Sequence, residues 1–180
     1  ASPLQLRETI YQCAPYIGFP KTLNAIDIAN GVFEANGISL PLENAGTVDA
    51  TDPSAREQAG AAIQAPLYGN EVKEVFSALP KPFDEFVPHL LTSSAFGDFA
   101  TRGGLDVAQR ELISLVAIAA IGATTQLRPH VAGAIRAGSS RQKVAAALVH
   151  VMPYIGGPYA LSGLVLVARY DESASAEVYR

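Results

Sequence analysis

The sequence predicts an all-α protein. Apolar residues recur at three- and four-residue spacing along nearly the whole chain, and no run of alternating valine, isoleucine and threonine indicates a sheet. Helix start signals also recur. Ser2 with Pro3, and Asp52 with Pro53, each place a capping side chain before a proline whose missing N–H costs nothing at the first helical position.

The first two helices precede a linker. The first helix starts at Ser2, and the second runs from about residue 20 to 36, where Gly37 is placed to end it in a left-handed conformation. Their predicted inward stripes are Leu6, Ile10, Cys13 and Ala14 in the first helix, and Leu23, Ile26, Asn30 and Phe33 in the second. Residues 38–53 carry prolines, a glycine and scattered acids, which is typical of an exposed connection.

Beyond the linker the pattern predicts six further helices after the one that starts at Asp52. Two short helices cover about 71–79 and 83–92, punctuated by prolines. Asp106 with Gln109 forms a capping box for a long helix that reaches Ile121. Three more follow at about 126–137, 141–152 and 158–170.

Composition excludes several classes of protein. Of 180 residues, 49% are hydrophobic and 17% charged, the balance of a packed globular chain. A net charge of -4 without a lysine or arginine run disfavours nucleic acid as a partner. The most apolar segment, 112–123, is too short to cross a membrane. Cys13 is the single cysteine, so no intrachain disulfide forms, and a cytoplasmic location is expected unless a cleaved signal preceded Ala1.

The chain contains an internal repeat. Shifting the N-terminal stretch by 138 positions aligns ASPLQLRETIYQCAPYIGFPKTL with SSRQKVAAALVHVMPYIGGPYAL, with six identities in nine residues. The alternative is that PYIG-x-P is merely a common corner between two helices. We interpret residues 1–37 as the C-terminal half of a first repeat unit, 38–53 as the linker and 54–180 as a complete unit.

Two ionisable residues are predicted to point inward on neighbouring helices. Glu111 lies near the start of a helix that is apolar nearly all round, and His130 shares a face with apolar residues of the next helix. If they meet, Glu111 orients the imidazole and favours its protonated form, which gives a proton donor and acceptor pair. The alternatives are a favourable helix-dipole interaction for Glu111 and a satisfied core histidine for His130.

The stretch GLDVAQRELISLVAIAAIGATTQLRPHVAGAIRAGSSRQKVAAALVHVMPYIGGP resembles the core of the carboxymuconolactone decarboxylase superfamily, which includes alkylhydroperoxidase D. FGDFATRGGLD resembles the end of the N-terminal helices of that superfamily. The resemblance implies a helical fold that assembles into homo-oligomers, trimers or hexamers, with the active site beside the helix hairpin. It also implies catalytic roles for Glu111 and His130.

In the peroxidase branch two cysteines stand between that glutamate and histidine, whereas this chain has Ala123 and Gln126 there. Thiol chemistry needs both sulfurs. The resemblance therefore favours the decarboxylase branch, with Gln126, Arg128 and Ser114 as candidate substrate contacts. Gln126 has the alternative of a solvated helix-start residue and Arg128 that of a surface charge.

We predict a decarboxylase-like lyase, or a related isomerase, acting on a small carboxylated lactone or enolisable acid. The alternatives are a thiol-dependent peroxidase, disfavoured by the missing cysteines, and a non-catalytic oligomeric protein. No metal is expected, because the three histidines lack metal-ligand spacing, and no cofactor is expected, because no glycine-rich phosphate loop occurs.

Overall fold

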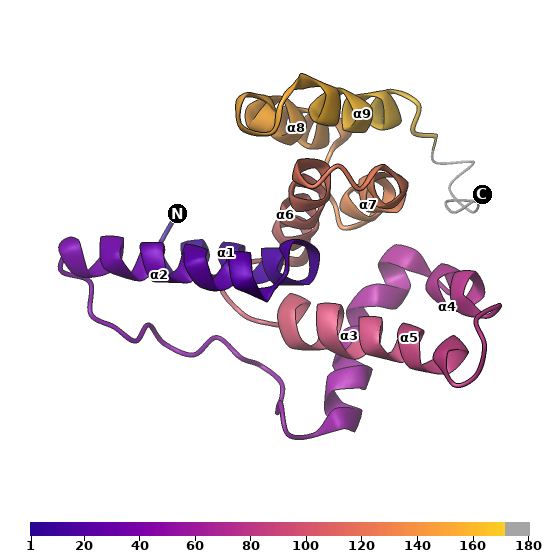
Figure 1. Ribbon diagram of the computed structural model, residues 1–180, viewed down its shortest axis with the longest axis horizontal. Helices are drawn as coiled ribbons and strands as arrows, with labels where there is room; N and C mark the ends of the chain where they lie inside the picture. Colours follow the sequence, from indigo (N-terminus) through magenta and orange to yellow (C-terminus); the bar gives the residue numbers. More distant parts are fainter. Residues whose placement is uncertain (172–180) are drawn as a thin grey trace.

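The computed structural model describes residues 1–171, in which no strand occurs (Figure 1). This confirms the all-α prediction. The helices are α1 (Pro3–Ile17), α2 (Phe19–Ala35), α3 (Pro53–Tyr68), α4 (Glu71–Phe76), α5 (Phe83–Leu91), the π-helix η1 (Thr92–Ala100), α6 (Val107–Ala120), α7 (Thr124–Arg136), α8 (Arg141–Ile155) and α9 (Gly157–Ala168). In Figure 1 the α8–α9 pair lies above α6 and the α1–α2 pair lies at the lower left of α6, whereas α3 to α5 lie at the lower right.

Helix ends follow the capping logic of the sequence. Ser2 Oγ accepts a hydrogen bond from the backbone of Gln5, whose side chain accepts one from the backbone of Ser2, so α1 begins with a capping box. Asp106 and Gln109 form the same reciprocal pair at the start of α6. Gly37 takes a φ of +71° directly after α2, as predicted for a helix stop.

The two PYIG-x-P corners have the same backbone shape. Gly18, between α1 and α2, has φ 83° and ψ 157°, and Gly156, between α8 and α9, has φ 90° and ψ 148°. A side chain is strained at such positive φ, so glycine is needed at both corners. The similarity is consistent with an internal repeat at these positions.

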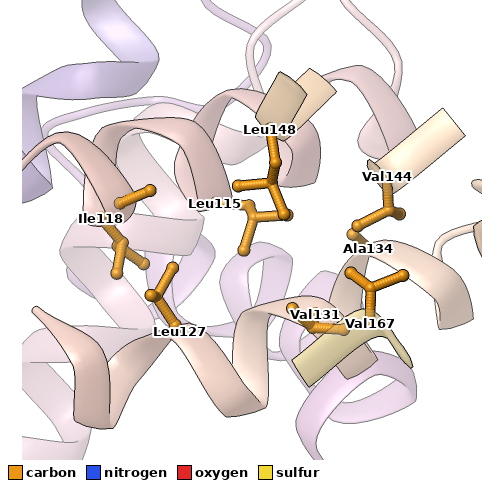
Figure 2. Close-up of a cluster of buried hydrophobic side chains, with 9 residues drawn as sticks. Leu115, Ile118, Leu127, Val131, Ala134, Val144, Leu148 and Val167 are labelled. Carbon is orange, nitrogen blue, oxygen red and sulfur yellow. The ribbon is translucent and has the colours of Figure 1, made fainter. Parts of the chain in front are cut away.

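The main core lies among the last four helices. It contains Leu115, Ile118, Ala119, Leu127, Val131, Ala134, Val144, Leu148 and Val167, all buried (Figure 2). Leu115 and Leu148 have no exposed surface. Close packing of this kind fixes α6 and α7 relative to each other, and therefore fixes the backbones that carry Glu111 and His130.

A second contact brings α3 against η1. A Cβ at Gly60 would lie 2.2 Å from the carbonyl oxygen of Thr92, and one at Gly97 would lie 2.4 Å from that of Arg56. The two backbones therefore touch, which only glycine permits at these positions. The crossing places Leu67 and Tyr68, at the end of α3, in a small buried cluster with Phe96 and Ala100.

The π-helix η1 was not predicted. The sequence pattern ended a helix at Thr92, whereas the chain continues helically to Ala100. Hydroxyl groups at its start bond backwards, Thr92 Oγ1 to the Pro88 carbonyl at 3.0 Å and Ser93 Oγ to the His89 carbonyl at 2.9 Å. Such side-chain bonds compete with the regular α-helical ladder, and helical periodicity gives no sign of the wider turn.

The inward faces predicted for α1 and α2 are partly wrong. Leu6 is 41% exposed and Leu23 is 65% exposed, whereas Glu8 and Gln12 are buried. Glu8 is inward because arginines from distant segments reach it: Arg102 Nε lies 2.8 Å from Oε2 and Arg102 Nη2 lies 2.9 Å from Oε1. The predicted face was derived from the spacing of apolar residues alone. That method places every carboxylate on the solvent side, including one such as Glu8 whose charge is paired and can therefore be buried.

The linker is exposed but anchored. Arg7 donates hydrogen bonds to the carbonyls of Leu42 at 3.2 Å and Glu43 at 2.6 Å, and the Gly103 N–H donates to the Ala45 carbonyl at 2.8 Å. These bonds hold the linker across α1 and the segment before α6. Among the helices of residues 1–171, none has the length and apolar character that a membrane crossing requires.

Candidate active site

Glu111 lies in the second turn of α6, since that helix begins at Val107. Its carboxylate is buried, with 4% of the side chain exposed, and faces α7. His130 lies in the second turn of α7, with 13% of its side chain exposed. His130 Nδ1 and Glu111 Oε2 are 3.5 Å apart, so the two residues singled out from the sequence do meet.

A tyrosine that the sequence did not single out stands between them. Tyr68, the last residue of α3, donates a hydrogen bond from its hydroxyl to Glu111 Oε2 at 2.5 Å. The same hydroxyl oxygen lies 2.8 Å from His130 Nδ1. Tyr68 is 43 positions from Glu111 and 62 from His130, and only the α3–η1 crossing brings it into reach. Nothing in its local sequence distinguishes it from the other tyrosines.

The hydrogen-bond geometry assigns the proton positions. A carboxylate only accepts and a phenol has a single hydrogen, which goes to Glu111. We therefore assign the hydrogen on His130 Nδ1 as the donor to the Tyr68 oxygen. The other ring nitrogen, Nε2, is then the atom at which His130 can take up or release a proton.

Gly133 is required for this arrangement. It lies one turn after His130 on α7, and a Cβ there would be 2.5 Å from the Tyr68 hydroxyl and 2.9 Å from Glu111 Oε2. Both distances are shorter than real Cβ contacts. Local sequence does not indicate that this position needs glycine, because the atoms that it accommodates come from α3 and α6.

Aromatic rings pack against His130 and Tyr68. Tyr16, at the end of α1, meets the His130 ring edge-on, with ring centroids 5.5 Å apart and planes at 86°. Phe96 of η1 packs against Tyr68 at 5.7 Å. Aromatic pairs prefer such edge-to-face contacts, which restrict rotation of the imidazole and the phenol.

The three residues predicted to contact substrate do not share a hydrogen-bonded group as Glu111 and His130 do. Ser114 is fully buried and accepts a hydrogen bond from Gln12 Nε2 at 3.1 Å. Gln126 and Arg128 are both exposed, in the first two turns of α7. Of the five predicted site residues, Glu111 and His130 therefore contact a common group, the Tyr68 hydroxyl.

Cys13 lies in α1, and burial raises the pKa of its thiol to about 11. The thiolate form, which is the nucleophile in disulfide chemistry, is therefore scarce near neutral pH. Within residues 1–171 there is also no cluster of three or more histidine, cysteine or acidic side chains that could hold a metal ion.

A cavity of about 800 Å³ lies between α3, α4 and α5, with Glu57, Gln64, Lys73 and His89 on its wall. His89 Nδ1 and Glu57 Oε1 are 3.1 Å apart there. The cavity is separate from the hydrogen-bonded group, since none of Tyr68, Glu111 and His130 lines it.

Residues 87–169 match the model of the carboxymuconolactone decarboxylase family. This segment includes Glu111, His130 and Gly133, and the resemblance stated from the sequence is confirmed over it. A protein named nitrosuccinic acid decarboxylase npaB, from Metarhizium robertsii, is 28% identical over 110 residues, which cover 61% of this chain and 77% of that protein.

Proposed function

We propose that this protein is a decarboxylase of small, activated carboxylic acids, in which His130 transfers the proton. The observation that carries the proposal is the hydrogen-bonded series Glu111, Tyr68 and His130. Three buried polar groups are costly to bring together unless they satisfy one another, and here they leave one imidazole nitrogen outside the series. The family match and the fungal decarboxylase support carbon–carbon bond cleavage.

The proposed reaction balances without a redox partner. The bond between the substrate carbon and its carboxylate breaks, carbon dioxide leaves, and the bonding electron pair remains on the carbon. An adjacent carbonyl or nitro group delocalises that pair as an enolate or nitronate. The proton on His130 Nε2 then forms the new C–H bond, and water reprotonates the imidazole. A carboxylated lactone and a nitro-substituted acid both meet this requirement.

Tyr68 and Glu111 are the positioning residues in this scheme. Tyr68 holds Nδ1 of His130 at 2.8 Å, so the ring presents Nε2 to the substrate. Glu111 accepts the hydrogen bond from the phenol and places a carboxylate oxygen 3.5 Å from Nδ1, which holds the Tyr68 hydroxyl and the imidazole in position. Donor and carboxylate are placed before the reaction, so little reorganisation is needed.

The proposal is tested with a panel of small carboxylated lactones and nitro- or keto-activated acids, including nitrosuccinate. We expect carbon dioxide release, with one deuterium incorporated at the vacated carbon in D₂O. His130→Ala is expected to lower kcat by about 10²- to 10⁴-fold, the usual contribution of a general acid. Circular dichroism verifies that the variant remains folded.

Tyr154→Phe is the matched control for variants of the site tyrosine, because Tyr154 is 82% exposed and lies near the end of α8. It should retain full activity. Turnover that persists in folded His130→Ala protein refutes the proposed role of His130. Dithiol-dependent peroxide consumption would favour the peroxidase alternative, and absence of turnover across the panel would favour a non-catalytic protein.

A further inference from the structure

We infer that α1 forms part of the site, and that Tyr16 is a positioning residue for His130. The inference rests on the proposed function, because it assigns Tyr16 a role at the same imidazole. Tyr16 contacts the His130 ring edge-on at 5.5 Å. Tyr68 contacts the same ring at 5.4 Å, also edge-on, so two tyrosines from α1 and α3 hold the imidazole.

A series of buried polar contacts fixes the position of α1 along α6. Glu8, Gln12 and Tyr16 are four residues apart on one face of α1, and Arg110 and Ser114 are four apart on α6. Arg110 lies 3.5 Å from Glu8 and donates to Gln12 at 3.0 Å, and Gln12 donates to Ser114 at 3.1 Å. We call these four residues, Glu8, Gln12, Arg110 and Ser114, the polar ladder.

The polar ladder sets the register of α1 along α6 and also holds the two helices together. A slip of one helical turn, about 5.4 Å, would separate Glu8 from its arginines and leave buried charges unpaired. Apolar packing alone tolerates such slips more readily, because dispersion contacts are not directional. The ladder continues toward the site, since Tyr16 is one turn beyond Gln12.

The corner between α8 and α9 offers a comparison, because the corresponding face of α8 has no polar ladder. The positions that correspond to Glu8, Gln12 and Tyr16 under the shift of 138 are Ala146, His150 and Tyr154. All three are exposed, and Tyr154 is 82% exposed. Both corners keep the tyrosine, whereas the buried carboxylate and amide occur only in α1, which docks on α6 through this face; α8 packs on α6 through its other face, which carries Val144 and Leu148.

The test uses the full chain and two readouts. The first is the ¹⁵N spectrum of the His130 ring, which requires no substrate and is assigned with His130→Ala among the three histidines. In the wild type we expect a protonated, hydrogen-bonded Nδ1. Tyr16→Leu should shift these signals toward those of a rotating imidazole, whereas Tyr16→Phe and the matched control Tyr154→Leu should leave them unchanged.

The second readout is kcat on a substrate that meets the proposed function. Tyr16→Leu should lower kcat by about tenfold to a hundredfold, since a misplacement of about 1 Å has effects of that size, with little change in KM. Gln12→Met removes two ladder contacts at similar volume and should shift the His130 signals in the same direction.

Unchanged His130 signals in folded Tyr16→Leu protein would overturn the role of Tyr16. Signals that move in Tyr16→Leu but not in Gln12→Met would overturn the role of the polar ladder. Failure of the proposed function alone would appear differently: no substrate is turned over, while the His130 signals still respond to Tyr16→Leu.

Discussion

Gly133→Ala is expected to disable the candidate site with little loss of helix structure. The new Cβ would lie 2.5 Å from the Tyr68 hydroxyl, about 0.9 Å short of the 3.4 Å at which ordinary contact begins. Tyr68 cannot simply turn away, because its hydroxyl is bonded to both Glu111 and His130. One of these hydrogen bonds must therefore lengthen or break.

Two opposing terms set the stability change. Alanine in place of glycine inside a helix stabilises it by about 0.5–1 kcal/mol, while overpacking costs about 1–3 kcal/mol. We expect a net destabilisation of about 1–2 kcal/mol. A displacement of about 1 Å at the reacting groups is expected to lower kcat by about a hundredfold.

Two other glycines provide controls. A Cβ at Gly31, on the exposed side of α2, meets nothing within 4 Å, so Gly31→Ala should be neutral or slightly stabilising. A Cβ at Gly163 would lie 2.9 Å from the end of the Leu148 side chain, so Gly163→Ala should cost stability by overpacking the core without touching the site. Chemical denaturation and kcat are measured for all three variants. Gly133→Ala protein with wild-type kcat would refute the close-approach reasoning.

Three further predictions concern Tyr68, Glu8 and Cys13. Tyr68→Phe removes the hydroxyl that bonds both Glu111 and His130 and leaves them only their mutual 3.5 Å contact; it should cost about 1–3 kcal/mol and reduce kcat while KM changes less. An unchanged kcat would contradict the positioning role. Glu8→Gln should lower the free energy of unfolding by about 3–5 kcal/mol at pH 7, because buried arginine charges lose their counter-ion. Desolvation raises the pKa of Glu8, but Arg102, Arg7 and Arg110 together hold it below its ordinary value, so its stabilisation is present above the unfolded pKa and is lost as pH falls through the folded one. The difference between wild type and Glu8→Gln should therefore shrink in acid, and a pH-independent difference would count against the ion pairing. Cys13, whose pKa is about 11, should react with iodoacetamide near pH 7 far more slowly in the native protein than in denatured protein, and equal rates would disprove its protection.

The helices themselves were largely predictable from local chemistry. Ser2, Asp52 and Asp106 cap the predicted helices, and Gly37 follows the end of α2. These features depend on residues within one turn of each other, so sequence spacing is sufficient to find them. The π-helix was not predicted, because the feature that accompanies it is hydrogen bonding from side-chain hydroxyls to carbonyls four residues earlier, which the spacing of apolar residues does not reveal.

The division of the chain into a half-unit, a linker and a complete unit stays a prediction, although the matching corners at Gly18 and Gly156 favour it. Homo-oligomer formation and a small-molecule substrate stay predictions as well. Leu6, expected to be inward, is exposed on this chain because Glu8 and Gln12 occupy the buried face of α1; Leu23 of α2, also expected to be inward, is exposed as well.

By itself the sequence determined the helical class, the capped helix starts and the facing positions of Glu111 and His130, because each depends on spacing within one or two adjacent helices. Only the tertiary structure decided what stands between those two groups. Tyr68 reaches the site through the Gly60–Gly97 crossing, Gly133 leaves room for it, and Glu8 of α1 pairs with Arg102 and Arg110, which are 94 and 102 positions away in sequence. Such contacts join residues tens of positions apart, and their geometry is defined only when the helices are packed.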